Sequence, residues 1–180
     1  MKRVTGLFII LFCTFLVSCN AIKKLGQFYI NYNTQAVFPA NIPINMPLSI
    51  TSPSIATNSS EIFQNNKTRS DLIQSVRLSQ LTLNITSPQG QTFSFLQNVS
   101  IYISSDSLPE VEIASKQNIP ANVGDTLTLD VTNVELQNYI KASEIKMRIA
   151  GTTDKLITTN VYVNVQARFF VQANLLAVLE

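Results

Sequence analysis

The chain of 180 residues has no histidine and no tryptophan, and its only two cysteines, Cys13 and Cys19, lie close to the N-terminus. Without histidine, one chain cannot build a Ser-His-Asp or a Cys-His nucleophile. A zinc site of histidine and thiolate ligands needs more of these side chains than the chain supplies. The composition therefore leaves only carboxylates for acid–base chemistry, and only oxygen ligands for a metal such as calcium or magnesium.

Charge is also scarce, because charged residues make up 13% of the chain, about half the usual share of roughly 25%. The chain has 13 basic and 11 acidic residues. Lys2 and Arg3 fall in the first eighteen residues, which contain no acidic residue, so the remainder carries eleven of each sign. No positive field is left to attract a polyanion, and the sequence predicts no nucleic-acid partner.

The N-terminal segment has the pattern of a secretory leader. Lys2 and Arg3 precede an apolar run from Val4 to Val17, which is shorter than the roughly 20 residues that a membrane-spanning helix needs. The run closes on Leu16-Val17-Ser18-Cys19, and this tetrapeptide resembles the lipobox of bacterial lipoproteins. The resemblance implies that a signal peptide of residues 1–18 is removed and that Cys19 is acylated. The alternatives are an ordinary signal peptide with an incidental cysteine and an uncleaved membrane anchor.

The segment after Cys19 bears on the location of the protein. Residues 19–26 form a short lipidated tether, and residues 27–180 suit a single domain by their length. In surface-exported lipoproteins of some bacteria, acidic residues follow the lipidated cysteine, whereas here the tether carries Lys23 and Lys24. The resemblance therefore implies a lipid-anchored protein of the bacterial cell envelope, on the outer membrane and facing the periplasm.

Apolar and polar residues alternate with a period of two along most of the chain after residue 27, which is typical of half-buried strands. Such runs at seven or eight places, with little helix between them, predict an all-β fold, namely an immunoglobulin-like antiparallel β-sandwich with one or two short helices. Pro43 and Pro47 place the second run at a sheet edge. The longest run, residues 161–173, predicts a bend or bulge near Ala167 that lets the strand serve two sheets.

Between the strands, the sequence gives several local signals. The stretch 51–69 is rich in Ser, Asn and Thr and predicts a long polar loop with one apolar plug at Ile62 and Phe63. Thr132-Asn133-Val134-Glu135 fits a capping box and predicts a helix from about Asn133 to Ala142. Ser87-Pro88-Gln89-Gly90 predicts a type I turn that closes a hairpin between the strands around Leu81 and Phe93, and 151–154 predicts a further turn.

Carboxylates are the remaining candidates for chemistry. Glu110 and Glu112 lie two apart on one strand and share a face, as a pair of glycoside-hydrolysing carboxylates would, although like charges on a strand are more often plain solvent-facing residues. Calcium would need several turn aspartates to converge. Those aspartates are Asp106, Asp125, Asp130 and Asp154. The sequence predicts no catalytic residue, no metal site and no cofactor.

Exposed aromatic side chains suggest a binding surface. Tyr29, Tyr102 and Tyr162 fall on the polar side of their strands, where they could stack on sugar rings or contact a partner protein. The polar face of the last strand is the candidate contact surface, with Tyr162, Arg168 and Phe170.

The predicted function is that of a non-enzymatic binding or scaffold module held at the membrane by its lipid anchor. Its partner would be another envelope protein or a glycan. One alternative is a carrier of lipid or another apolar ligand, which would need a cavity between the sheets. The other is a glycan hydrolase that uses carboxylates alone.

Overall fold

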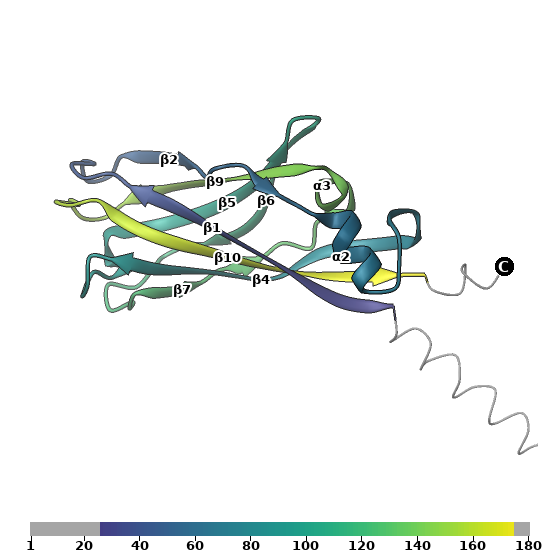
Figure 1. Ribbon diagram of the computed structural model, residues 1–180. Helices are drawn as coiled ribbons and strands as arrows, with labels where there is room; N and C mark the ends of the chain where they lie inside the picture. Colours follow the sequence, from purple (N-terminus) through teal and green to yellow (C-terminus); the bar gives the residue numbers. More distant parts are fainter. Residues whose placement is uncertain (1–25, 175–180) are drawn as a thin grey trace, which may run out of the picture.

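Two antiparallel sheets face each other in the computed structural model, which describes residues 26–174 (Figure 1). Sheet A consists, in spatial order, of β1 (Gln27–Phe38), β10 (Val161–Ala173), β4 (Ile73–Ser87) and β7 (Thr126–Thr128). Sheet B consists of β2 (Pro47–Thr51), β9 (Glu144–Thr153), β5 (Leu96–Ser105), β6 (Leu108–Lys116) and β8 (Asp130–Val131), and β3 (Ile55–Ala56) also pairs with β9. The leader and Cys19 lie outside the described residues.

Helices are short and few in this part of the chain. They are α2 (Ser59–Asn65), α3 (Gln137–Lys141) and the single 3₁₀ turns η1 (Ser70–Leu72) and η2 (Phe93–Phe95). Across residues 26–174 no helix combines the length and the apolar character needed to cross a membrane. The strands therefore carry the fold, and the helices cover parts of it.

The connections between strands follow a jelly-roll order. With the two-residue strands β3 and β8 left aside, the chain changes sheet at every connection except one, the β5–β6 hairpin at Asp106-Ser107. This alternation produces the two Greek keys of a jelly roll. The antiparallel β-sandwich predicted from the sequence is confirmed. Its strands follow the jelly-roll order, which the sequence does not specify and which differs from the order of strands in immunoglobulin domains.

The core lies between the sheets and is made by the period-two positions. Along β10, Val161, Val163, Val165, Ala167, Phe169 and Val171 are all buried. Each fully buried valine or phenylalanine side chain among them stabilises the fold by about 1.5–3 kcal/mol. The ring of Phe38 on β1 meets that of Phe95 edge to face, with centroids 5.3 Å apart, so an aromatic contact joins sheet A to the turn η2, which precedes β5 of sheet B.

The last strand is more regular than the sequence predicts. β10 pairs with β1 without any register shift, and its three shifts against β4 place the extra residue on β4, for example Ser79. The predicted bulge at Ala167 is therefore wrong, and β10 lies in sheet A alone. β10 has no extra residue of its own, because the extra residues of this pairing all lie on β4.

The stretch 51–69 is not the long loop predicted from its composition. It contains β3 and α2, and Phe63 on α2 is fully buried, which confirms the apolar plug. The hydroxyl of Tyr32 donates to the backbone oxygen of Thr57 over 2.7 Å, and burial raises the pKa of this hydroxyl. Asn58 stands at the N-cap of α2 with φ 46° and makes no side-chain cap hydrogen bond, although asparagine is a preferred residue at this position.

The capping box predicted at residues 132–135 does not form. Thr132 Oγ1 donates to the backbone oxygen of Ile113 over 3.1 Å. Glu135 Oε1 accepts from the backbone N–H groups of Val76, at 2.7 Å, and Gln137, at 3.0 Å. Although partial burial raises the pKa of Glu135, these hydrogen bonds hold it below its usual range. The helix shortens to α3, because Thr132 binds the backbone of β6, and Glu135 binds both β4 and the first residue of α3, Gln137.

Two predicted turns also differ. β4 and β5 lie in different sheets, so the segment 87–90 crosses the sandwich and closes no hairpin. Gly151 lies inside β9, between Leu48 of β2 and Val99 of β5. A Cβ atom there would collide with the backbone oxygen of Asn98. This glycine marks a close approach of two strands and not a turn.

Candidate functional site

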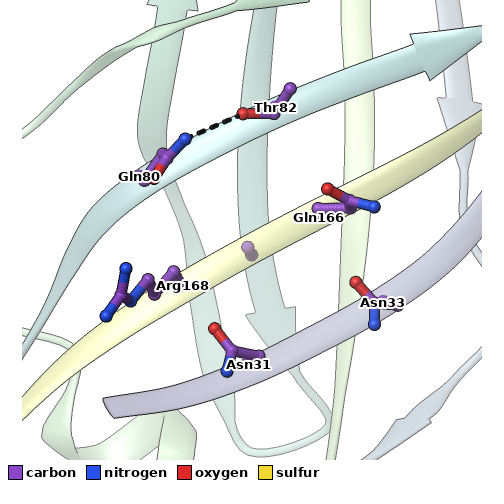
Figure 2. A pocket seen from close by; sticks show the side chains of 7 residues that line it. Asn31, Asn33, Gln80, Thr82, Gln166 and Arg168 are labelled. Carbon is purple, nitrogen blue, oxygen red and sulfur yellow. Dashed lines mark hydrogen bonds between the residues drawn. The ribbon is translucent and has the colours of Figure 1, made fainter.

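A shallow polar groove crosses the outer face of sheet A, and we call it the sheet A groove. Its volume is about 350 Å³. Three neighbouring strands line it, as Figure 2 shows: β1, β10 and β4. The lining residues are Asn31, Asn33, Gln80, Thr82, Gln166, Ala167 and Arg168.

The strand register places these side chains in two rows across the sheet. Asn31 lies opposite Arg168, and Arg168 lies opposite Gln80. The next row is Asn33, Gln166 and Thr82. Neighbouring strands are about 4.8 Å apart, and positions two residues apart on a strand are separated by about 6.7 Å. Amide and hydroxyl groups therefore recur at short, regular intervals on a surface that the backbone holds in place.

The β4 bulge contributes directly to this surface. Ser79 is the extra residue between Leu78, opposite Phe169, and Gln80, opposite Arg168. If β4 paired with β10 without a bulge, Ser79 would lie opposite Arg168 and the side chain of Gln80 would turn toward the core, because a shift of one residue moves a side chain to the other face. The Ser79 hydroxyl donates to the Arg168 backbone oxygen over 2.8 Å. The bulge thus sets the composition of the groove.

A third row adds an aromatic end to the groove. Tyr29 lies opposite Phe170, with ring centroids 5.5 Å apart. The guanidinium carbon of Arg168 stands 3.9 Å from the centre of the Tyr29 ring, a cation–π contact. Tyr29 is 48% exposed, so this end of the groove offers an accessible aromatic surface.

The strands of sheet A contain no aspartate and no glutamate. Their only charged residues are Arg77 on β4 and Arg168 on β10. Arg77 Nε lies 3.9 Å from Glu135 Oε2, a carboxylate outside the sheet. The outer face is therefore dominated by neutral amides and has a positive charge at Arg168.

The structure brings together two of the three contact residues predicted from the sequence. Arg168 and Phe170 adjoin each other around Tyr29. Tyr162 lies opposite Val37, six residues before Arg168, which is about 20 Å along the strand. Tyr162 therefore does not join the groove. Sequence reasoning placed Tyr29 on an exposed face, but its contact with Arg168 depends on the β1–β10 register.

The predicted carboxylate pair on β6 is engaged elsewhere. On the outer face of sheet B, Arg148 donates to both carboxylate oxygens of Glu110, over 2.6 and 2.7 Å. The hydrogen bond from Arg148 is the main cause that lowers the pKa of Glu110. The same guanidinium stands 4.3 Å from the ring centre of Tyr102. Glu110 is thus an ion-pair partner and does not face Glu112 as a free carboxylate.

The turn aspartates do not converge. Asp106 pairs with Lys146 at 3.0 Å, and Asp130 pairs with Lys116 at 3.1 Å. Between Gly26 and Asn174, no three acidic side chains lie close enough together to hold a metal ion. Asp106 and Asp130 therefore take part in separate surface ion pairs, which contribute little to stability.

Comparison with known proteins gives similarities of fold alone. No family model matches the sequence, and no curated protein matches it either. A Clostridium perfringens protein, CpGH89CBM32-5, solved in complex with GalNAc-β-1,3-galactose, is 11% identical, with a TM-score of 0.34 over 80% of this chain and 97% of that one. The decameric BFDV capsid protein is 7% identical, with a TM-score of 0.38 over 82% and 98% of the two chains. The C-terminal domain of a chitobiase from Bacteroides fragilis is 15% identical, with a TM-score of 0.30 over 72% and 64%.

Proposed function

We propose that this chain is a lipid-anchored envelope protein that acts as a non-enzymatic binding module and holds a glycan in the sheet A groove. The observation that carries this proposal is the lining of the groove. Four amide side chains and one hydroxyl face outward from three adjacent strands, and an exposed tyrosine ring adjoins them.

This lining matches the chemistry of sugar hydroxyls. Each Asn or Gln side chain offers one carbonyl acceptor and two N–H donors, and a sugar hydroxyl both donates and accepts. The apolar face of a sugar ring can pack on the Tyr29 ring, as apolar surfaces pack on aromatic faces. Because the lining residues stand on paired strands, little backbone freedom is lost on binding.

The two alternative functions find less support. A carrier would need room between the sheets, and that space is filled by side chains with 0% exposure, such as Leu81, Ile101 and Phe169. A hydrolase would need two carboxylates beside its substrate, and the strands that line the groove contain none.

Substitution of two groove amides tests the binding site. The full-length protein in mild detergent is screened against an oligosaccharide array, and affinities for the ligands found are measured by titration calorimetry. The double variant Asn31→Ala/Gln166→Ala is expected to bind about 10- to 50-fold more weakly, because each lost hydrogen bond contributes about 0.5–1.5 kcal/mol. Gln97→Ala is the control, since this exposed amide lies on β5 of sheet B. An unchanged affinity of the double variant would place the site elsewhere.

The lipid anchor is tested separately at Cys19. In a bacterial host fed with labelled palmitate, the wild-type protein is expected to carry the label and to sediment with outer membranes. Cys19→Ser is expected to carry no label and to leave the membrane fraction, because two or more acyl chains are needed for firm anchoring. Protease added to intact cells should leave the wild-type protein uncut if it faces the periplasm. An unlabelled wild-type band contradicts the anchor.

A further inference from the structure

One arginine in the described part of the chain lacks the carboxylate partner that the other arginines have. Between Gly26 and Asn174 there are four arginines, and three of them pair with a carboxylate: Arg69 with Asp71, Arg77 with Glu135, and Arg148 with Glu110. Arg168 pairs with no carboxylate of this part of the chain, and its recorded contact is the Tyr29 ring. Its guanidinium therefore has N–H groups to offer a ligand.

The opposite sheet has a similar stack of an arginine on a tyrosine, together with a carboxylate. On sheet B, Arg148 stacks on Tyr102 with 4.3 Å to the ring centre, and Glu110 binds the guanidinium through two hydrogen bonds. On sheet A, Arg168 stacks on Tyr29 with 3.9 Å to the ring centre. Tyr102 lies directly opposite Arg148, whereas Tyr29 lies one row away from Arg168. Both faces therefore stack an arginine on a tyrosine, and only sheet B adds a carboxylate.

We propose that the glycan held in the sheet A groove bears a carboxylate, as uronic acids do, and that Arg168 pairs with it as Arg148 pairs with Glu110. This inference rests on the proposed function and narrows its ligand class. A guanidinium binds a carboxylate through two parallel hydrogen bonds, which are stronger than those between neutral groups. No acidic side chain on the strands of sheet A competes for this position.

The surroundings of Arg168 suit a sugar that carries the anion. Asn31 on β1 and Gln80 on β4 flank it in the same cross-strand row, as Figure 2 shows. Their amides can bind the hydroxyl groups next to a carboxylate on one pyranose ring. The guanidinium carbon lies 3.9 Å from the centre of the Tyr29 ring, and Arg168 is exposed. Arg168 would thus bind the carboxylate of the sugar, and Asn31 and Gln80 would bind its ring hydroxyl groups.

The test uses pairs of ligands that differ only in the carboxylate. Oligogalacturonides, oligomannuronides and hyaluronan oligosaccharides are each titrated into the full-length protein beside their carboxyl-reduced forms. Wild-type protein is expected to bind at least one acidic member about tenfold or more tightly than its reduced form, since a charge-assisted pair is lost in the latter. The preference is expected to fall as salt is raised.

Two arginine variants assign the preference to one residue. Arg168→Gln is expected to bind the acidic and the reduced member of the pair with equal affinity, so that the ratio of the two affinities falls to about one. Arg148→Gln removes the matched arginine of the other sheet and is expected to keep the full preference. Circular dichroism spectra of both variants should match that of the wild type. A preference that survives Arg168→Gln overturns the proposal.

The outcomes separate this inference from the proposed function. If the wild-type protein binds the acidic oligosaccharide and its carboxyl-reduced form equally, the glycan site stands and only the proposed recognition of the carboxylate is overturned. Binding of neither member of any pair contradicts the glycan site as well. Preferential binding of a sulfated over a desulfated chondroitin, without a carboxylate preference, assigns Arg168 to a different anion. Equally tight binding of a polyglutamate peptide assigns the surface to an acidic protein partner and overturns the glycan class.

Discussion

Replacement of Phe63 by alanine is expected to lower the free energy of unfolding by about 3–5 kcal/mol, the usual range for a buried phenylalanine. Phe63 is fully buried, although it belongs to a seven-residue helix in a polar stretch. Its ring meets that of Phe28 edge to face, with centroids 6.4 Å apart. Alanine would leave a cavity beside β1 that neighbouring side chains cannot fill without moving the helix.

Urea unfolding followed by circular dichroism measures this effect, because the chain has no tryptophan to report by fluorescence. Gln64→Ala is the matched control, since it shortens an exposed side chain on the same helix. The control is expected to change stability by less than about 0.5 kcal/mol. A cost below about 1 kcal/mol for Phe63→Ala would show that α2 contributes no part of the core.

Gly151→Ala is expected to destabilise the protein by about 1–3 kcal/mol, the usual cost of overpacking. Replacing glycine by alanine normally stabilises by about 0.4–1 kcal/mol where the backbone tolerates it, because the unfolded chain loses freedom. At Gly151 the new Cβ would collide with the backbone oxygen of Asn98 and approach Cα of Val99 closely. Backbone atoms cannot rotate away as a side chain can, so β9 and β5 must separate.

Gly124→Ala provides the opposite case. Neither glycine has a positive φ, and a Cβ at Gly124 would meet nothing within 4 Å. This variant is therefore expected to be neutral or slightly stabilising in the same urea titration. If the two variants unfold at the same urea concentration, the close approach of β5 to Gly151 does not limit the fold.

The sequence predicts the strands well because half-buried strands show the period of two that burial imposes. Val161 to Ala173 reads correctly as one strand for this reason. The bulges of β4 are invisible in the sequence, because an extra residue such as Ser79 interrupts the period without a signal of its own. The β4–β5 connection is misread for a related reason: a turn motif shows where the chain bends but not which sheet receives the next strand.

The candidate site is predicted only in part. Arg168 and Phe170 are two positions apart on one strand, so their place on its exposed face can be predicted from the local alternation alone. The contact between Arg168 and Tyr29 joins the last strand to the first, and no local pattern contains it. Tyr162 shares the parity of Arg168 but lies beside Val37, at the far end of that pairing. The alternation along one strand determines which face of the sheet a side chain lies on, whereas the register between strands determines which side chains are its neighbours there.

The position of β10 between β1 and β4 has a consequence for biogenesis (Figure 1). Within the described residues, β1 meets the rest of sheet A only through β10, which follows all the other strands of that sheet in the sequence. Pairings between such distant segments form slowly, because a long loop must close first. A nascent chain that ends before Val161 therefore has neither the two rows of amides nor a place for β1. Ligand occupancy would then report that β10 has been synthesised and has paired with β1 and β4.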